Sequence, residues 1–109
     1  MAGRAHRFDL YLTALDPVRG SEIAKARPCA VVSSEEMNAR LRTVIVVPMS
    51  SKQTGYPFRV AVGFGGVSGE LLTDHVRSVH RSRLIRHLGA LDPATSQALL
   101  AKLVDIFQP

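Results

Sequence analysis

Cysteine, acidic residues and long apolar runs are all scarce in this chain of 109 residues. Cys29 is the only cysteine, so no disulfide can form within the chain, and a reducing compartment such as the cytoplasm fits best. No run approaches the roughly 18 apolar residues of a membrane span, and Asp9 interrupts the basic N-terminal stretch before an apolar region follows. The sequence therefore predicts neither a membrane span nor a signal peptide.

Signatures of metal and nucleotide binding are missing as well. No H-x-x-x-H pair and no Cys/His spacing indicates a metal site. The stretch from Gly63 to Gly69 contains four glycines, but it lacks the Lys-Ser/Thr pair and the following helix of a phosphate-binding loop. We interpret this stretch as a hairpin connection, and we expect no metal and no cofactor.

The charge balance is basic, with 14 Lys and Arg against nine Asp and Glu and a net charge of +5 at pH 7. This balance favours polyanionic or acidic partners, because phosphate contacts supply most non-specific nucleic-acid affinity, although solubility alone explains it equally well. The length predicts a single domain over residues 1–109. So small a domain has a high ratio of surface to volume, and a second copy would add burial.

Apolar runs predict the first three strands. Residues 9–15 form a strand that ends at Asp16, because a proline restricts the residue before it to extended geometry. Residues 29–32 form a second strand, which Pro28 opens because proline has no N–H to donate. Residues 43–47 are nearly all β-branched and have no polar face after the first residue, which is typical of a strand buried on both sides.

Two further strands complete the expected sheet. Residues 58–62 alternate between apolar and other side chains, which predicts a fourth strand with one apolar face. Residues 70–79 predict a long fifth strand, with a bulge or bend beyond Asp74 where the alternation breaks. The sheet that results is small, mostly antiparallel and strongly curved.

Helical signals are weaker until the C-terminus. Ser33 to Glu36 fits a capping box and predicts one turn over residues 34–40. Residues 81–88 are compatible with one or two helical turns closed by Gly89. A terminal helix begins at Asp92-Pro93 and covers one open face of the sheet. Its apolar residues at helical spacing are Leu100, Leu103, Val104 and Phe107.

Four motifs follow one another in a recognisable order. Leu-Asp-Pro-x-x-Gly-Ser-Glu-Ile leads to Lys-x-Arg-Pro over residues 15–28, and Thr-Val-Ile-Val-Val-Pro-x-Ser-Ser occupies residues 43–51. Gly-Tyr-Pro-Phe follows at residues 55–58, and Asp-x-Val-Arg-Ser at residues 74–78. In this order the motifs resemble the MazF/PemK toxins, the ribosome-independent, sequence-selective endoribonucleases of toxin–antitoxin modules. The resemblance runs from about residue 7 to residue 107.

The resemblance implies a fold, an activity and partners. The fold is mainly β, a small SH3-like barrel of the MazF/CcdB toxin type with about five to seven antiparallel strands and a C-terminal helix. The activity is cleavage of single-stranded RNA without metal, which leaves 2′,3′-cyclic phosphate and 5′-hydroxyl ends and so inhibits translation and growth. The implied partners are a second copy in a homodimer and a cognate acidic, MazE-like antitoxin whose initially disordered segment blocks the basic groove.

Roles for four side chains follow from the same resemblance. Arg27 matches the family's catalytic arginine, and its planar fork can bond two phosphoryl oxygens. Ser50 stands where the family has a threonine that bonds the scissile phosphate. Glu22 matches an acidic residue that acts as a base or orients Arg27, and pairing with arginine favours the orienting role because it lowers a carboxyl pKa. His75 replaces a commoner glutamine, and an imidazole can transfer protons near neutral pH.

Further residues are candidates for RNA contact. Lys25, Lys52 and Arg77 would contact phosphates, and Tyr56 would stack on an exposed base. Ser51 would replace Ser50 if the motif were shifted by one position. A solvated surface role remains the alternative for these side chains.

Departures from the family pattern keep other functions open. Leu72 stands where some PemK-type members have an arginine that acts with the aspartate at Asp74, and Phe8 stands where glycine is usual. One alternative is a non-catalytic inhibitor of DNA gyrase on the same fold, like CcdB, and another is an RNA-binding module with a decayed site. The combination of Glu22, Arg27 and Ser50 favours cleavage, because a gyrase inhibitor does not need it.

Overall fold

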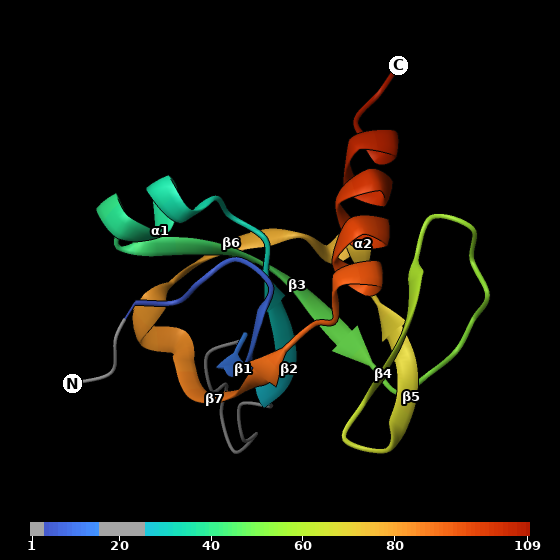
Figure 1. Ribbon diagram of the computed structural model, residues 1–109, viewed down its shortest axis with the longest axis horizontal. Coiled ribbons are helices and arrows are strands. Elements are labelled where there is room, and N and C mark those ends of the chain that lie inside the picture. The colour runs from blue at the N-terminus through green and yellow to red at the C-terminus, as the bar shows by residue number, and fades with distance from the viewer. Residues whose placement is uncertain (1–3, 16–25) are drawn as a thin grey trace, which may run out of the picture.

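The computed structural model describes residues 4–15 and 26–109 (Figure 1). Within these ranges the chain forms seven strands, two α-helices and two short 3-10 turns. In chain order they are β1 (Asp9–Ala14), β2 (Ala26–Val31), α1 (Glu35–Arg40), β3 (Thr43–Ser50), β4 (Val60–Phe64), β5 (Val67–Leu71), η1 (Thr73–His75), β6 (Arg77–His80), η2 (Arg81–Arg83), β7 (Leu84–Ala90) and α2 (Pro93–Ile106). Neither helix is long and apolar enough to cross a membrane.

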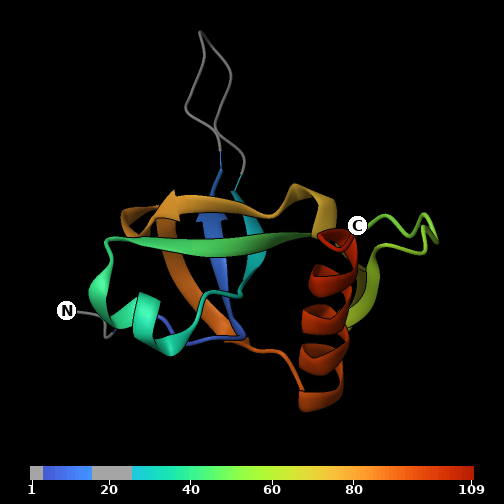
Figure 2. The ribbon, with the colours of Figure 1, turned by 90° about the horizontal axis from the view of Figure 1, so that it is seen from above.

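The strands form one strongly curved antiparallel sheet in the order β4-β5-β3-β2-β1-β7, with β6 beside β3 as well (Figures 1 and 2). β3 is the central strand because two other strands pair with different parts of one of its edges. Its first half pairs with β6, from Thr43 opposite His80 onward, and its last two residues pair with β5, where Ser50 lies opposite Glu70. Its other edge pairs with β2. The predicted fold class, a curved antiparallel barrel with a C-terminal helix, is confirmed.

Both faces of β3 are buried, as predicted for residues 43–47. Val44 and Val46 belong to a core cluster that also contains the side chain of Cys29 in β2. Val47 belongs to a second cluster, where fully buried Leu99 of α2 packs onto the sheet. α2 thus covers one face of the sheet, and β3 connects the two clusters.

Two strand predictions need correction. β3 continues through Pro48 to Ser50, because Pro48 needs no N–H there and its carbonyl accepts the N–H of Leu72 at 2.8 Å. The single strand predicted over residues 70–79 is wrong, since η1 divides it into the end of β5 and β6. This break moves the chain from one half of β3 to the other. The glycine-rich stretch is the predicted hairpin, and its turn residues Gly65 and Gly66 have φ of 60° and 79°.

Two of the helix predictions also differ from the structure. The turns predicted over residues 81–88 are wrong beyond η2, because β7 begins at Leu84 and pairs with β1. The cap of α1 is shifted by one residue, since Ser34 accepts the N–H of Met37 at 3.2 Å while Ser33 accepts the N–H of Ile45 from β3. Pairing across the sheet outweighs local helix signals in both places.

The terminal helix begins where the sequence predicts, and Leu103 of the predicted face packs against the core, but the rest of the buried face differs. Asp92 is the N-cap residue and Pro93 opens the helix, although no hydrogen bond from the helix reaches the Asp92 side chain. Leu99, outside the predicted face, is the residue that packs fully into the core. Val104 and Phe107, which belonged to the predicted face, are exposed.

Phe8 adopts a left-handed backbone conformation with φ of 73°. Its N–H donates to the carbonyl of Val31 and its carbonyl accepts the N–H of Leu91, so hydrogen bonds on both sides fix this geometry. Only glycine adopts such a φ without steric cost. The backbone therefore explains why glycine is usual at this position in the family that the chain resembles.

Candidate functional site

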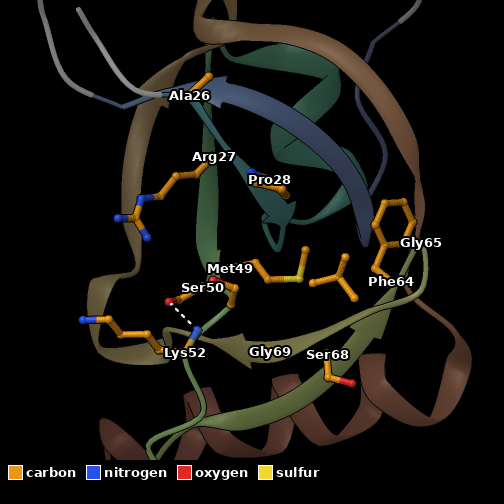
Figure 3. A pocket seen from close by; sticks show the side chains of 12 residues that line it. Ala26, Arg27, Pro28, Met49, Ser50, Lys52, Phe64, Gly65, Ser68 and Gly69 are labelled. Carbon is orange, nitrogen blue, oxygen red and sulfur yellow. Dashed lines mark hydrogen bonds between the residues drawn. The ribbon is translucent and has the colours of Figure 1, made fainter.

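The beginning of β2 and the end of β3 open onto a cleft of about 810 Å³, which the β4–β5 hairpin closes on the far side (Figure 3). Its lining residues are Ala26, Arg27, Pro28, Met49, Ser50, Ser51, Lys52, Phe64, Gly65, Val67, Ser68 and Gly69. We call this hollow the main cleft.

Arg27 and Ser50 meet because of the register between their strands. β2 and β3 pair with Cys29 opposite Pro48, and the same register continued by two residues places Arg27 opposite Ser50. The Ser50 hydroxyl accepts the backbone N–H of Lys52 at 3.1 Å. In Figure 3 the side chains of Arg27 and Lys52 extend to the same side, with Ser50 between them. Two cationic groups on either side of a hydroxyl suit a phosphate group.

A second hollow of about 560 Å³ adjoins the first and shares Arg27, Ser50 and Lys52 with it. We call it the basic hollow, because most of its remaining polar side chains are cationic or titratable. Its full lining is Leu15, Arg27, Pro48, Ser50, Lys52, Thr54, Arg59, Leu72, His75 and Arg77. The three shared residues form the boundary between the two hollows.

Arg59 forms a two-pronged ion pair at the wall of the basic hollow. Its Nε donates to Asp74 Oδ1 at 2.9 Å and its Nη2 donates to Oδ2 at 3.0 Å, while Nη1 lies 3.9 Å from Glu70 Oε2. The side chains of Arg59 and Glu70 are only 14% and 5% exposed. The hydrogen bonds from Arg59 hold the pKa of Asp74 below its usual value, and the pKa of Arg59 is raised in turn.

Glu70 also anchors the loop between β3 and β4. Its carboxylate accepts the backbone N–H of Thr54 at 2.5 Å and the Thr54 hydroxyl at 2.8 Å. The hydrogen bond from this N–H is the main reason that the pKa of Glu70 lies below its usual value. Glu70 is therefore an ionised group that ties this loop to β5.

His75 stands at the edge of the basic hollow, at the end of η1. Its Nε2 lies 3.6 Å from Oδ2 of Asp74, the carboxylate that Arg59 also holds. Half of its side chain is exposed, so solvent or a ligand can reach the ring. The arrangement brings an imidazole to the hollow that contains Arg27 and Ser50.

The structure brings together most of the side chains that the sequence singled out. Arg27, Ser50 and Lys52 lie together and line both hollows, and Ser51 lines the main cleft. His75 and Arg77 line the basic hollow. Tyr56 lines neither hollow and lies on the β3–β4 loop. Glu22 and Lys25 lie outside the described residues.

Two features of the site escaped the sequence analysis. Leu72 is a buried core residue, and the guanidinium that reaches Asp74 comes instead from Arg59, 15 positions away. No local pattern marks that pair, since Arg59 sits in an alternating stretch like any outward-facing strand residue. Gly69 lines the main cleft, and its only sequence signal was a cluster of glycines that suggested a turn.

Comparisons with known proteins identify relatives along nearly the whole chain. A family model described as "PemK-like, MazF-like toxin of type II toxin-antitoxin system" matches residues 6–107. The endoribonuclease toxin MazF of Escherichia coli (strain K12) is 33% identical over 96 residues, which are 87% of this chain and 86% of that protein.

Solved structures agree with this result. The crystal structure of MazF from Deinococcus radiodurans is 29% identical with a TM-score of 0.80, and the match covers 96% of this chain and 97% of that one. A MazE–MazF crystal structure from the same organism is 30% identical with a TM-score of 0.81, covering 94% of each chain.

Proposed function

Because this chain belongs to the PemK-like, MazF-like toxins of type II toxin–antitoxin systems, we propose that it is a sequence-selective endoribonuclease that cleaves single-stranded RNA. The cleavage needs no metal and leaves 2′,3′-cyclic phosphate and 5′-hydroxyl ends, and loss of mRNA inhibits translation and growth. The observation that carries the proposal is the meeting of Arg27, Ser50 and Lys52 at the boundary of the two hollows.

Cleavage of this kind needs three functions around one phosphate. One group removes the proton of the 2′-hydroxyl, another stabilises extra charge on the phosphoryl oxygens, and a third protonates the 5′-oxygen that leaves. Arg27 supplies the charge stabilisation, since its guanidinium keeps its proton and offers two parallel donors. Ser50 donates a hydrogen bond to the same phosphate, and Lys52 adds positive charge.

We assign proton transfer to His75, and Glu22 is the second candidate for this role. His75 lines the hollow that contains Arg27 and Ser50, and an imidazole exchanges protons readily at neutral pH. Lys25, Ser51 and Arg77 contact flanking phosphates in this proposal.

The toxin acts with two protein partners. A MazE–MazF complex is known for the Deinococcus radiodurans protein, and we assign to this chain a cognate acidic, MazE-like antitoxin that covers the basic hollow. We infer a single domain over residues 1–109, which the contribution of β2 and β3 to both core clusters supports. The chain works as a homodimer in the cytoplasm. Exposed apolar Val104 and Phe107 favour such self-association, which light scattering would measure.

The decisive experiment incubates the purified protein with a mixed-sequence RNA in excess chelator and maps the new ends. We expect cleavage at a short recognition sequence with cyclic phosphate ends. Arg27→Ala should lose about a hundred- to a thousandfold in rate, as the loss of a charge-stabilising donor does. Arg40→Ala, at an exposed position of α1, is the matched control and should cleave like the wild type.

Each alternative function gives a different result. RNA binding without turnover by the wild type would indicate a decayed site. DNA damage in cells with intact RNA would indicate a gyrase inhibitor instead. Full activity of Arg27→Ala would remove Arg27 from the mechanism.

A further inference from the structure

Two aromatic side chains on the β3–β4 loop form a stacked pair. The ring centroids of Tyr56 and Phe58 are 5.2 Å apart and the ring planes differ by 12°. Both residues are exposed, at 50% and 38%. The loop that carries them projects from the side of the barrel formed by β4, β5 and α2 (Figures 1 and 2). Together they are two of the six aromatic residues of the chain.

Arg59 lies on the same side of Tyr56 as Phe58 does. Its guanidinium carbon is 5.0 Å from the centroid of Tyr56 and 5.8 Å from that of Phe58. Groups that covered opposite faces of Tyr56 would be separated by two contact distances, ~7 Å or more. The shorter distance from Arg59 to Phe58 therefore places both groups behind one face of the tyrosine, which leaves the other face turned away from them.

The pair is held rigidly on its loop. Arg59 is fixed by its two hydrogen bonds to Asp74, and Thr54 is fixed by Glu70 of β5. The N–H of Tyr56 donates to the Thr54 hydroxyl at 3.3 Å, so the backbone of Tyr56 is held through Thr54 to Glu70. Binding of a ligand that stacks on Tyr56 thus costs little conformational entropy of the loop.

The same anchors place the ring pair next to the basic hollow. Thr54 and Arg59 line that hollow together with Arg27 and Ser50, and Tyr56 lies between them in sequence. A polyanion bound along the basic hollow therefore lies beside the loop that carries Tyr56. Among polyanions, single-stranded RNA offers flat unpaired bases at regular intervals along its phosphates.

We propose that Tyr56, backed by Phe58 and Arg59, is a stacking platform for one unpaired nucleobase close to the cleaved phosphate. This inference rests on the proposed ribonuclease function and adds a base-binding subsite to it. Every base has a π-face, so the platform contributes affinity with little preference for base identity. It selects for unpaired RNA, because a base within a duplex is stacked on its neighbours and does not offer a free face.

A protein–RNA double-mutant cycle tests the platform directly. The probe is a fluorescently labelled RNA oligonucleotide whose 2′-hydroxyls are replaced by fluorine, which removes the nucleophile and keeps the strand intact. In a series of these oligonucleotides, one base at a time is replaced by an abasic sugar. Binding to the wild type, Tyr56→Ala and Tyr56→Phe is followed by fluorescence anisotropy in chelator.

Tyr56→Ala should weaken binding of the complete RNA by roughly 5- to 100-fold, the range found when a base loses an aromatic partner. Tyr56→Phe keeps the ring and should bind within about twofold of the wild type. At one position of the series, the abasic substitution should weaken the wild type and abolish the difference between the wild type and Tyr56→Ala. Ile85→Ala, an exposed apolar residue of β7, is the matched control and should show no such coupling.

Three outcomes would overturn the platform. The first is binding of the complete RNA by Tyr56→Ala as tight as by the wild type. The second is a Tyr56→Ala protein that binds every abasic RNA more weakly than the wild type does, by the same factor at each position. The third is a loss of affinity by Tyr56→Phe as large as that by Tyr56→Ala, which would assign the effect to the hydroxyl group and not to the ring. The measurement does not depend on cleavage, so coupling without cleavage by the wild type would contradict only the ribonuclease function.

Discussion

A Cβ atom added to Gly69 would lie 2.0 Å from the backbone carbonyl oxygen of Ser50. No real side chain tolerates this separation, so β5 approaches the end of β3 only because residue 69 has no side chain. The contact arises where Ser50 pairs with Glu70, the residue next to Gly69. The glycine thereby sets the position of the backbone that carries the Ser50 hydroxyl.

Gly69→Ala should displace Ser50 and reduce both activity and stability. The obstructing atom belongs to the backbone and cannot rotate away, so either β5 or the end of β3 must move. We expect kcat to fall at least about tenfold, since about 1 Å of displacement can cost still more, and the free energy of unfolding to fall by about 1–3 kcal/mol. RNA cleavage rates and urea denaturation measure the two effects.

Gly63→Ala provides the matched control for this substitution. Gly63 lies on β4, and an added Cβ would meet nothing within 4 Å. Its activity should equal that of the wild type, and its stability should change by no more than about 0.5 kcal/mol. If Gly69→Ala behaved in the same way, the close approach would not control Ser50.

The family resemblance singled out Arg27 and Ser50, and the strand pattern is consistent with their meeting. Arg27 and Ser50 lie at the ends of two apolar runs, and the antiparallel pairing of neighbouring strands is enough to bring them together. Arg59 and Asp74 could not be predicted as a pair, because their contact depends on how the long loop before β4 folds back onto η1. Gly69 looked like a turn residue, since its partner carbonyl at Ser50 is distant in sequence.

The predicted fifth strand failed for a related reason. Residues 70–79 look extended locally, and nothing within them shows that β3 accepts β5 along one half and β6 along the other. The 3-10 turn at Thr73–His75 makes this change of partner possible. It also positions Asp74 and His75 at the basic hollow, so the error in the fold and the missed ion pair share one cause.

Stability should fall at acid pH through the carboxylates that hold the β3–β4 loop. Hydrogen bonds from Arg59 and Thr54 hold the pKa values of Asp74 and Glu70 below their usual 3.8 and 4.5. A depressed pKa in the folded state means that the unfolded chain binds protons more readily. This stabilisation is therefore complete above about pH 5 and is lost as the pH falls through the depressed values.

Asp74→Asn tests this origin of the pH dependence. Asparagine keeps one oxygen as an acceptor for Arg59 but does not titrate, so the decline in unfolding free energy between pH 5 and about pH 3 should be shallower than in the wild type. Urea denaturation at each pH measures this decline. Glu36→Gln removes a carboxylate from an exposed ion pair with Arg40 and should keep the wild-type slope, because such surface pairs contribute little. Equal slopes for all three proteins would place the acid sensitivity elsewhere.

The backbone at Phe8 predicts an unusual order of stability between two substitutions. Phe8→Ala and Phe8→Gly both remove the half-buried ring, but only alanine keeps the steric cost of φ at 73°. Phe8→Gly should therefore be more stable than Phe8→Ala by about 1 kcal/mol. At the exposed helical position Ala101, glycine should instead be less stable than alanine by about 1 kcal/mol. Thermal or urea unfolding measures the stability difference between the glycine and alanine variants at each position, and this difference should have opposite signs at Phe8 and Ala101.

Alanine substitutions of Ser50, the last residue of β3, and of Ser51, which follows it, show which of the two serines contacts the reacting phosphate. Ser50 borders both hollows, whereas Ser51 lines only the main cleft. If Ser50 bonds the reacting phosphate, Ser50→Ala should lower kcat by about a hundredfold while Ser51→Ala changes it by less than about threefold. Ser50→Thr should keep the activity and raise it by at most about threefold, because a β-branched side chain restricts the hydroxyl to fewer of its three staggered positions. The reverse order of the two alanine variants in single-turnover cleavage would assign the phosphate contact to Ser51.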